Sequence, residues 1–255
     1  MRVAVIGLFH REFFYIPLWQ NYYGKLFGLE NLYAIGDLEK DETFKLFNKG
    51  VNFINYAPPL YANHSEHTQL IIKVQTELLN KYDVVIFAEA DQFFIPDPDK
   101  YLNLNDYLYR NPQDYIKVSG YNVRQDLTSE SFYDPTVKIL DQRKYWFKDP
   151  GPEDKLVIIR KPMNFYGTGF HVCQPNTDRD PDLINIHLQK FDFNLCNCRF
   201  FIKTRTENKH PAFSKHGEGG HVWMNDDELW HDWLRENQAL NLELIPQKYK
   251  DLGLI

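Results

Sequence analysis

Short apolar runs alternate with segments of helical spacing over the first hundred residues, and no other feature restricts the fold as much. The pattern predicts strands at residues 3–6, 32–35, 51–54 and 84–88. It predicts helices between them at residues 14–23, 41–47 and 68–80. Strands that alternate with helices in this way form a parallel sheet with helices on both faces. The sequence therefore predicts an α/β fold.

The rest of the chain has a different sequence pattern, because Pro and Gly turns divide its apolar segments. We expect a helix at 103–109, strands at 115–118, 155–160, 170–173 and 183–188, and an irregular polar and aromatic stretch at 126–152. A last helix follows Asn225, with Leu229, Trp230, Trp233 and Leu234 as its buried stripe. A length of 255 residues is ordinary for one α/β domain, so a single domain over 1–255 is expected.

Composition excludes some classes of partner. The chain has 29 Lys and Arg against 35 Asp and Glu, a net charge of −6, which argues against a nucleic-acid partner or an anionic membrane surface. No apolar run approaches the ~18 residues of a membrane span. Three cysteines (Cys173, Cys196 and Cys198) are too few for a disulfide framework and fit a reducing compartment, so a cytoplasmic location is expected.

Two carboxylates, Glu89 and Asp91, follow the clearest predicted strand. Side chains two residues apart on an extended chain point the same way, so both converge past the carboxyl end of that strand. Open α/β sheets bind their ligands at this edge. The two carboxylates would repel each other unless a divalent cation lies between them, and that cation could also hold substrate phosphates. The alternative interpretation is a polar turn at the end of a strand.

The residues around this pair carry a family resemblance. The run Glu89-Ala90-Asp91-Gln92-Phe93-Phe94 resembles the strand-end motif of GT-A fold nucleotide-diphospho-sugar glycosyltransferases, in particular family-2-like members, whose motif reads Asp-x-Asp followed by Glu or Gln and Phe. The opening is also similar, with His10-Arg11-Glu12 ahead of Trp19 and Gly24 where the family often has Arg-Asn-Glu. The second predicted strand closes on Asp37, as the family's second strand ends in an acidic turn. The resemblance covers about the first hundred residues.

The resemblance implies a single GT-A-like (Rossmann-like) domain with a mostly parallel central sheet flanked by helices and a mixed C-terminal part on the acceptor side. Residues 1–100 would form the nucleotide-binding half, and residues 101–255 the acceptor-side half and the C-terminal helix. The implied activity is a metal-dependent glycosyltransferase that moves a sugar from a nucleotide-sugar donor to a hydroxyl of a carbohydrate or glycoconjugate acceptor. The implied cofactor is Mn²⁺ or Mg²⁺.

The resemblance also suggests site residues. The metal ligands would be Asp91, Glu89 and a histidine from a late strand, for which His187 is preferred over His171. Glu89 stands where the family has Asp, so Asp91 is the safer ligand. Nucleotide-sugar contacts are expected from Phe9, His10, Arg11, Asp37 and Lys161, and further basic candidates are Arg143, Lys144 and Arg160. The catalytic base is not assigned; Asp134 and Asp182 are candidates among the loop carboxylates, with Asp141, Asp149, Glu153, Asp178 and Asp180.

Two other functions remain open at this stage. A sugar-phosphate nucleotidyltransferase shares the sheet and the acidic residues, but it would need a glycine-rich phosphate loop after the first strand, where this chain has only Gly7. A non-catalytic protein that binds a nucleotide-sugar or carbohydrate on the same fold is the other alternative, because Glu89 and the unassigned base weaken the case for catalysis.

Overall fold

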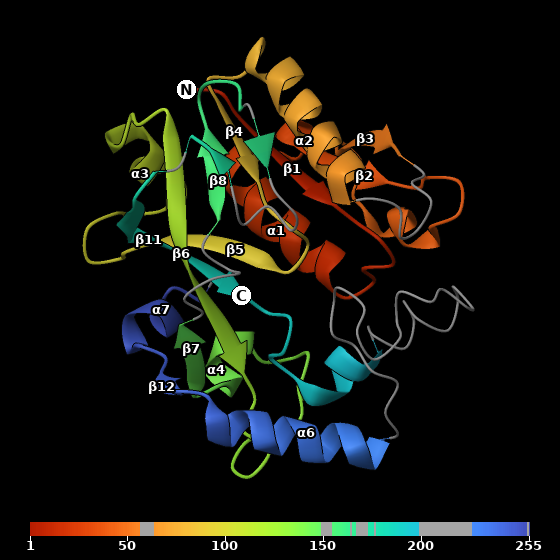
Figure 1. Cartoon of the computed structure of the whole chain (residues 1–255), viewed down its shortest axis with the longest axis vertical. Coiled ribbons are helices and arrows are strands. Elements are labelled where there is room, and N and C mark those ends of the chain that lie inside the picture. Colours follow the sequence, from red (N-terminus) through yellow and green to blue (C-terminus); the bar gives the residue numbers. More distant parts are fainter. Residues whose placement is uncertain are drawn as a thin grey trace.

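The computed structural model describes residues 1–56, 64–148, 155–163, 165–166, 173–175, 177–198, 226–253 and 255. In this part of the chain the fold is α/β, with a mixed central sheet flanked by helices (Figure 1). The predicted fold class is therefore confirmed. Within the same residues, no helix is both long enough and apolar enough to cross a membrane.

The predicted alternation of the first half is confirmed. Its elements are β1 (Val3–Leu8), α1 (Tyr15–Phe27), η1 (Leu29–Asn31), β2 (Leu32–Gly36), η2 (Glu42–Leu46), β3 (Asn52–Asn55), α2 (His64–Leu79) and β4 (Val84–Phe87). The segment expected as a helix at 41–47 is the short 3-10 helix η2, in which the Thr43 N–H donates to the side chain of the N-cap residue Asp41.

The second half differs from expectation in several places. Its elements are β5 (Gln92–Pro96), α3 (Leu104–Arg110), β6 (Tyr115–Arg124), α4 (Ile139–Gln142), β7 (Tyr145–Lys148), β8 (Leu156–Ile159), β9 (Phe165–Tyr166), β10 (Cys173–Gln174), β11 (Arg179–His187), α6 (Asp226–Ala239), β12 (Glu243–Leu244) and α7 (Gln247–Asp251). The expectation of an irregular stretch at 126–152 is wrong in part, because α4 and β7 lie within it, stabilised by β6 and α7. Strand β5 was not expected, and of the strand predicted at 170–173 only Cys173 lies within the described residues.

The strands of the main sheet follow the order β12-β7-β6-β8-β4-β1-β2-β3, and β11 joins β6 to β5. Strands β1 to β4 are parallel, and β8 lies antiparallel between β4 and β6. Among the described strands of this sheet, only β5, β7 and β8 run against the direction of β1, as their pairings require. The sheet is therefore mixed and mostly parallel, as predicted.

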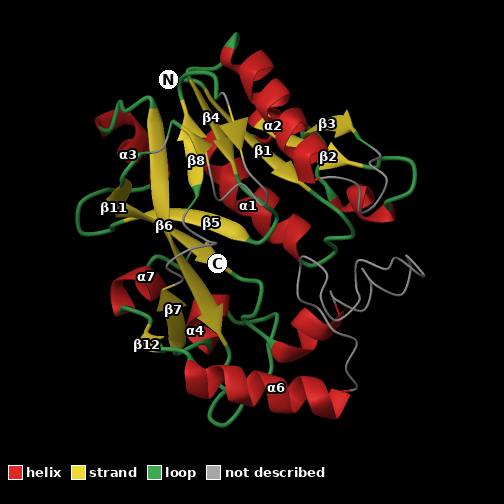
Figure 2. Cartoon of the chain, in the orientation of Figure 1, coloured by secondary structure: helices red, strands yellow, loops and turns green. Residues whose placement is uncertain are grey.

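Helices α1 and α2 cover opposite faces of the parallel strands. Trp19 of α1 lies in one core cluster with Val5 and Ile86, whereas Val74 of α2 lies in the other with Ile6. Side chains on a strand alternate between its two faces, so the neighbours Val5 and Ile6 reach different helices. The helices lie on both sides of the sheet, and α6 lies at the opposite end of the molecule from α2 (Figure 2).

The strand order creates a switch point between β1 and β4. From β1 the chain passes through α1 to β2 on one side, and after β3 it returns through α2 to β4 on the other side of β1. The chain ends of β1 and β4 stay in contact there, since the Ala88 N–H donates to Ile6 O (2.9 Å). In open α/β sheets, ligands bind outside the carboxyl ends of the strands at such a point. The residues that follow β1 and β4 are therefore the first candidates for a ligand-binding site.

Candidate functional site

Asp91, His187 and Asn122 form the centre of the candidate site. Asp91 lies between β4 and β5, His187 ends β11, and Asn122 belongs to β6. The registers place His187 beside Gln92 on one side and beside Asn122 on the other. Asp91 Oδ2 lies 3.4 Å from His187 Nε2, and His187 Nδ1 lies 2.6 Å from Asn122 Oδ1. All three residues are buried. The structure thus brings together two of the three predicted metal ligands.

The orientation of His187 determines what this centre can do. A carbonyl oxygen only accepts hydrogen bonds, so the Nδ1–H group of His187 donates to Asn122 Oδ1. In the neutral imidazole, Nε2 then carries its lone pair toward the Asp91 carboxylate. A nitrogen and an oxygen donor that face each other in this way suit a shared cation, and the Asn122 contact is the outer hydrogen bond that metal-binding histidines usually make.

The protein donors at this centre are few. Within the described residues, no group of three or more His, Cys, Asp and Glu side chains is arranged to hold a metal ion. A cation at Asp91 and His187 would therefore take its remaining ligands from elsewhere. Mg²⁺ commonly binds in this manner, with one or two protein carboxylates, several waters and the phosphates of the substrate.

Glu89, the third predicted metal ligand, has other partners. Its Oε2 atom forms an ion pair with Lys155 Nζ and accepts a hydrogen bond from Gln92 Nε2 (2.9 Å). Lys155 is almost completely buried. Sequence reasoning did not select Lys155 or Asn122; the only available signal was a polar residue inside or beside an otherwise apolar strand.

Helix α1 holds the backbone around the acidic residues. Strand β5 has a single neighbouring strand among the described residues, and its other edge meets the tyrosines of α1. The Tyr23 hydroxyl donates to Gln92 O (3.0 Å), and the Tyr22 hydroxyl donates to Phe94 O (2.7 Å). Trp19 Nε1 donates to Ala88 O (3.2 Å). Burial raises the pKa of Tyr22, so this hydroxyl stays a proton donor. The aromatic helix therefore fixes the turn that carries Asp91.

Four of the predicted nucleotide-sugar contacts follow β1 or β2, at the same edge of the sheet. Phe9 is buried among Trp19 and Phe47, so its ring belongs to the core. Arg11 has a left-handed backbone (φ 54°), and its N–H donates to Asp41 Oδ2 (2.6 Å). His10 is half-buried beside it.

The fourth residue at this edge is Asp37, whose side chain organises the turn after β2. Its Oδ1 atom accepts hydrogen bonds from the N–H groups of Glu39 (3.2 Å) and Lys40 (3.1 Å). The turn is therefore fixed by one of the carboxylates that sequence reasoning assigned to the nucleotide-sugar. Asp37 remains at the edge of the sheet where the residues after β1 and β4 also lie.

The structure does not bring Lys161 to this edge. Strand β8 runs antiparallel to β4, with Ile159 beside Val85, so residues that follow β8 lie at the opposite edge of the sheet. Lys161 pairs there with Asp114 (2.7 Å), which raises the pKa of the lysine. Its expected contact with the nucleotide-sugar has no support from this placement.

Of the two base candidates, Asp182 lies away from this centre. Asp182 pairs with Lys100 (2.5 Å) and precedes His187 by five residues of β11, or about 17 Å of strand. Asp134 is exposed, and hydrogen bonds from Thr136 lower its pKa. Asp182 is therefore not close to the Asp91–His187 centre, whereas the role of Asp134 as a base stays a prediction. His171, the alternative metal ligand, lies outside the described residues.

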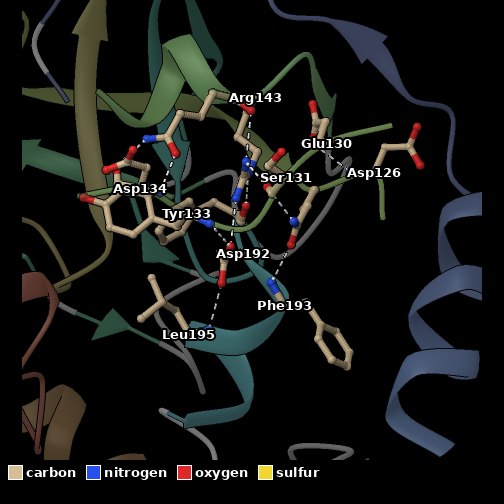
Figure 3. Close-up of polar contacts among 12 residues, drawn as sticks. Asp126, Glu130, Ser131, Tyr133, Asp134, Arg143, Asp192, Phe193 and Leu195 are labelled. Atoms are coloured by element: carbon tan, nitrogen blue, oxygen red, sulfur yellow. Dashed lines mark hydrogen bonds and ion pairs between the residues drawn. The ribbon is translucent and has the colours of Figure 1, made fainter. Parts of the chain in front are cut away.

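Arg143, a predicted phosphate contact, is instead part of a buried polar network with Asp192 (Figure 3). Its Nη2 atom lies 2.9 Å from Asp192 Oδ2, and each side chain is only 1% exposed. Asp192 also accepts hydrogen bonds from the N–H groups of Tyr133 (2.7 Å) and Leu195 (3.0 Å). The network ties the chain that follows His187 to the loop after β6, so Arg143 has a structural partner.

Comparisons with known proteins do not define a family. No protein-family model matches the chain, and no curated protein is similar to it. Chains of solved structures do match, among them the crystal structure of mannose-1-phosphate geranyltransferase from Thermus thermophilus, with a TM-score of 0.35 and 9% sequence identity. The match covers 79% of this chain and 60% of that one, so this chain spans about 60% of the length of that protein. A similarity at this level does not assign an activity.

Proposed function

We propose that the protein is a metal-dependent glycosyltransferase that moves a sugar from a nucleotide diphosphate-sugar to a hydroxyl acceptor, a carbohydrate or glycoconjugate. The observation that carries the proposal is the Asp91–His187 pair, with its two donor atoms 3.4 Å apart and buried at the switch-point edge of the sheet. The acidic strand-end motif and the mostly parallel sheet agree with the GT-A-like resemblance drawn from the sequence.

Asp91 Oδ2 and His187 Nε2 would hold Mn²⁺ or Mg²⁺. The bound cation supplies electrostatic stabilisation for the charge that develops on the departing diphosphate. Asn122 keeps the imidazole in one orientation and one tautomer. The backbone contacts from α1 keep Asp91 at a fixed position, so that little reorganisation is needed when the donor binds.

The nucleotide would lie across the switch point. The residues after β1, His10 and Arg11, and the turn at Asp37 line the same edge as Asp91, as the parallel pairing of β1 with β2 and β4 requires. Arg11 offers a permanent positive charge for a phosphate oxygen or for the nucleotide. Asp37 offers a carboxylate for hydroxyl or base N–H groups.

Gly7 favours sugar transfer over nucleotidyl transfer. A Cβ atom at this position would lie 2.8 Å from Ala88 O, so packing of β1 against the chain after β4 explains the glycine. The loop after β1 then has no glycine left for close backbone approach to a triphosphate.

Thermal-shift and binding measurements with a panel of nucleotide-sugars, with and without Mn²⁺, test the proposal. A donor at about 100 times its dissociation constant should stabilise the wild type by about 2.7 kcal/mol. Asp91→Asn and His187→Gln should abolish the Mn²⁺-dependent part. Glu39→Gln, which removes an exposed carboxylate from the same edge of the sheet, should retain it.

Unchanged Mn²⁺-dependent binding in Asp91→Asn would reject the metal site. Slow hydrolysis of one donor in the presence of Mn²⁺ would support catalysis. Tight donor binding with neither hydrolysis nor transfer to any acceptor would favour the non-catalytic binding protein instead.

A further inference from the structure

Lys155 is a buried cation at the edge of the candidate site. It is 3% exposed, and its carbonyl oxygen accepts a hydrogen bond from Val118 N (2.9 Å), which fixes its backbone beside β6. Because β8 runs antiparallel to β4, the residue before β8 lies near the carboxyl end of β4. An ion pair joins its Nζ atom to Glu89 Oε2 there.

The Glu89 carboxylate is engaged through one of its two oxygens. Lys155 Nζ and Gln92 Nε2 both reach Oε2, whereas no hydrogen bond from a described residue reaches Oε1. The Glu89 side chain is 34% exposed, in contrast to the 4% of Lys155. The carboxylate can therefore leave the pair without a large change in burial, but the ammonium group needs an anionic partner wherever it stays.

A diphosphate at the Asp91–His187 centre would supply such a partner. Glu89 and Asp91 are two residues apart in one turn, so the phosphates bound there come close to the pair. Phosphate oxygens carry more negative charge than one carboxylate, and they are strong acceptors for an ammonium group. When a metal ion and a diphosphate bind, the phosphate oxygens can thus replace Glu89 as the partner of Lys155, and the metal ion can replace Lys155 as the partner of Glu89.

We propose that Lys155 is an anion-binding residue for the donor diphosphate and that Glu89 is its counter-ion until the diphosphate arrives, an inference that rests on the proposed function. When cation and diphosphate bind together, the ammonium group turns to phosphate oxygens and the Glu89 carboxylate turns to the cation. No covalent bond forms or breaks in this exchange. Its consequence is coupling, because each ligand binds more tightly in the presence of the other.

The experiment measures Mn²⁺ alone, inorganic pyrophosphate alone and both together, by electron paramagnetic resonance and titration calorimetry. In Lys155→Met a positive charge disappears and Glu89 is released. Mn²⁺ alone should therefore bind about tenfold more tightly, and pyrophosphate alone about tenfold more weakly. The coupling between the two ligands should be lost.

Glu89→Gln gives the opposite sign, because it removes the negative charge of the pair and keeps the size of the side chain. The ammonium group of Lys155 is then released from the ion pair, so pyrophosphate alone should bind several-fold more tightly than to the wild type. Lys40→Met and Glu39→Gln are the matched controls, because they remove the same charges from exposed positions at the same edge. Each control should change either affinity less than about twofold.

Three results would overturn the inference. If Lys155→Met binds both probes like the wild type, the exchange of partners is wrong while the metal site stands. If the controls shift the affinities as much as Lys155→Met does, the change in affinity comes from the net charge near the site and not from a direct contact of Lys155 with the phosphates. If the wild type binds no Mn²⁺ even with pyrophosphate, this inference and the proposed function fail together.

Discussion

Replacement of Asp192 by Ala tests the buried network that supports the site. The carboxylate accepts hydrogen bonds from Arg143 Nη2 and from the N–H groups of Tyr133 and Leu195. Both partners of the ion pair are 1% exposed, so Asp192→Ala leaves a guanidinium without its counter-ion in the interior. Removal of one partner from a buried pair costs about 3–5 kcal/mol.

Because Arg143 keeps its other hydrogen bonds in the variant, we expect the loss in free energy of unfolding to lie within the range of about 3–5 kcal/mol. Its guanidinium still donates to three carbonyl oxygens, those of Phe191, Ser131 (3.1 Å) and Gln142 (2.9 Å). We expect Asp192→Ala to lower the free energy of unfolding by about 4 kcal/mol. For a chain of this size, that loss lowers the melting temperature by roughly 8–16 °C.

Urea unfolding followed by circular dichroism measures the change, with Asp182→Ala as the matched control. Asp182 pairs with Lys100, whose side chain is 52% exposed, so the control should lose no more than about 1 kcal/mol. The double variant Arg143→Met with Asp192→Leu should recover most of the loss, because apolar residues replace both charges. A loss below about 1 kcal/mol in Asp192→Ala would refute the reasoning.

Three further predictions concern the site and its surroundings. Asn122→Leu should weaken Mn²⁺ binding about 10- to 100-fold in calorimetry, because His187 loses the hydrogen bond that orients its ring; an unchanged affinity would contradict this role. Tyr23→Phe should cost about 1–3 kcal/mol in urea unfolding, because backbone groups at the edge of β5 lose their buried partner, and a loss near zero would mean that β5 does not depend on α1. Burial raises the pKa of Asp97, but hydrogen bonds from Lys248 and from a backbone N–H outweigh it and hold the pKa below 3.8. The stability that this shift contributes is therefore present above pH 3.8, and it is lost as the pH falls through the pKa of Asp97 in the folded protein. Lys248→Met should therefore flatten the acid limb of a stability curve measured from pH 6 to pH 2, and an unchanged slope would reject the pairing.

The chain sequence alone determined the parallel half of the fold. Short apolar runs separated by helical segments leave few arrangements, because the central strands β1 and β4 are buried on both faces and parallel strands need crossover connections. The same reasoning placed Glu89 and Asp91 at the carboxyl end of β4. Their place after β4 is a local property, because both follow directly on its apolar run, whereas the extended chain expected there is a turn closed by the hydrogen bond from Gln92 N to Glu89 O (3.0 Å).

Strand β5 and the segment 126–152 depended on the tertiary structure. The run that forms β5 entered the sequence analysis only as the end of the acidic motif, with no strand predicted, and it forms a strand through β11 on one side and the tyrosines of α1 on the other. The elements α4 and β7 arise in the same way, from contacts with distant residues. No local pattern encodes such partners.

The tertiary structure determines which residues form the candidate site. Asn122 and Lys155 reach it through strand registers, and His187, preferred over His171 from the sequence, meets Asn122 only because β11 pairs with β6. Lys161 and Asp182 carry suitable chemistry, yet the direction of their strands places them away from Asp91. Sequence identifies which side chains can donate to a cation, whereas the direction and register of strands far apart in the chain determine which of them meet.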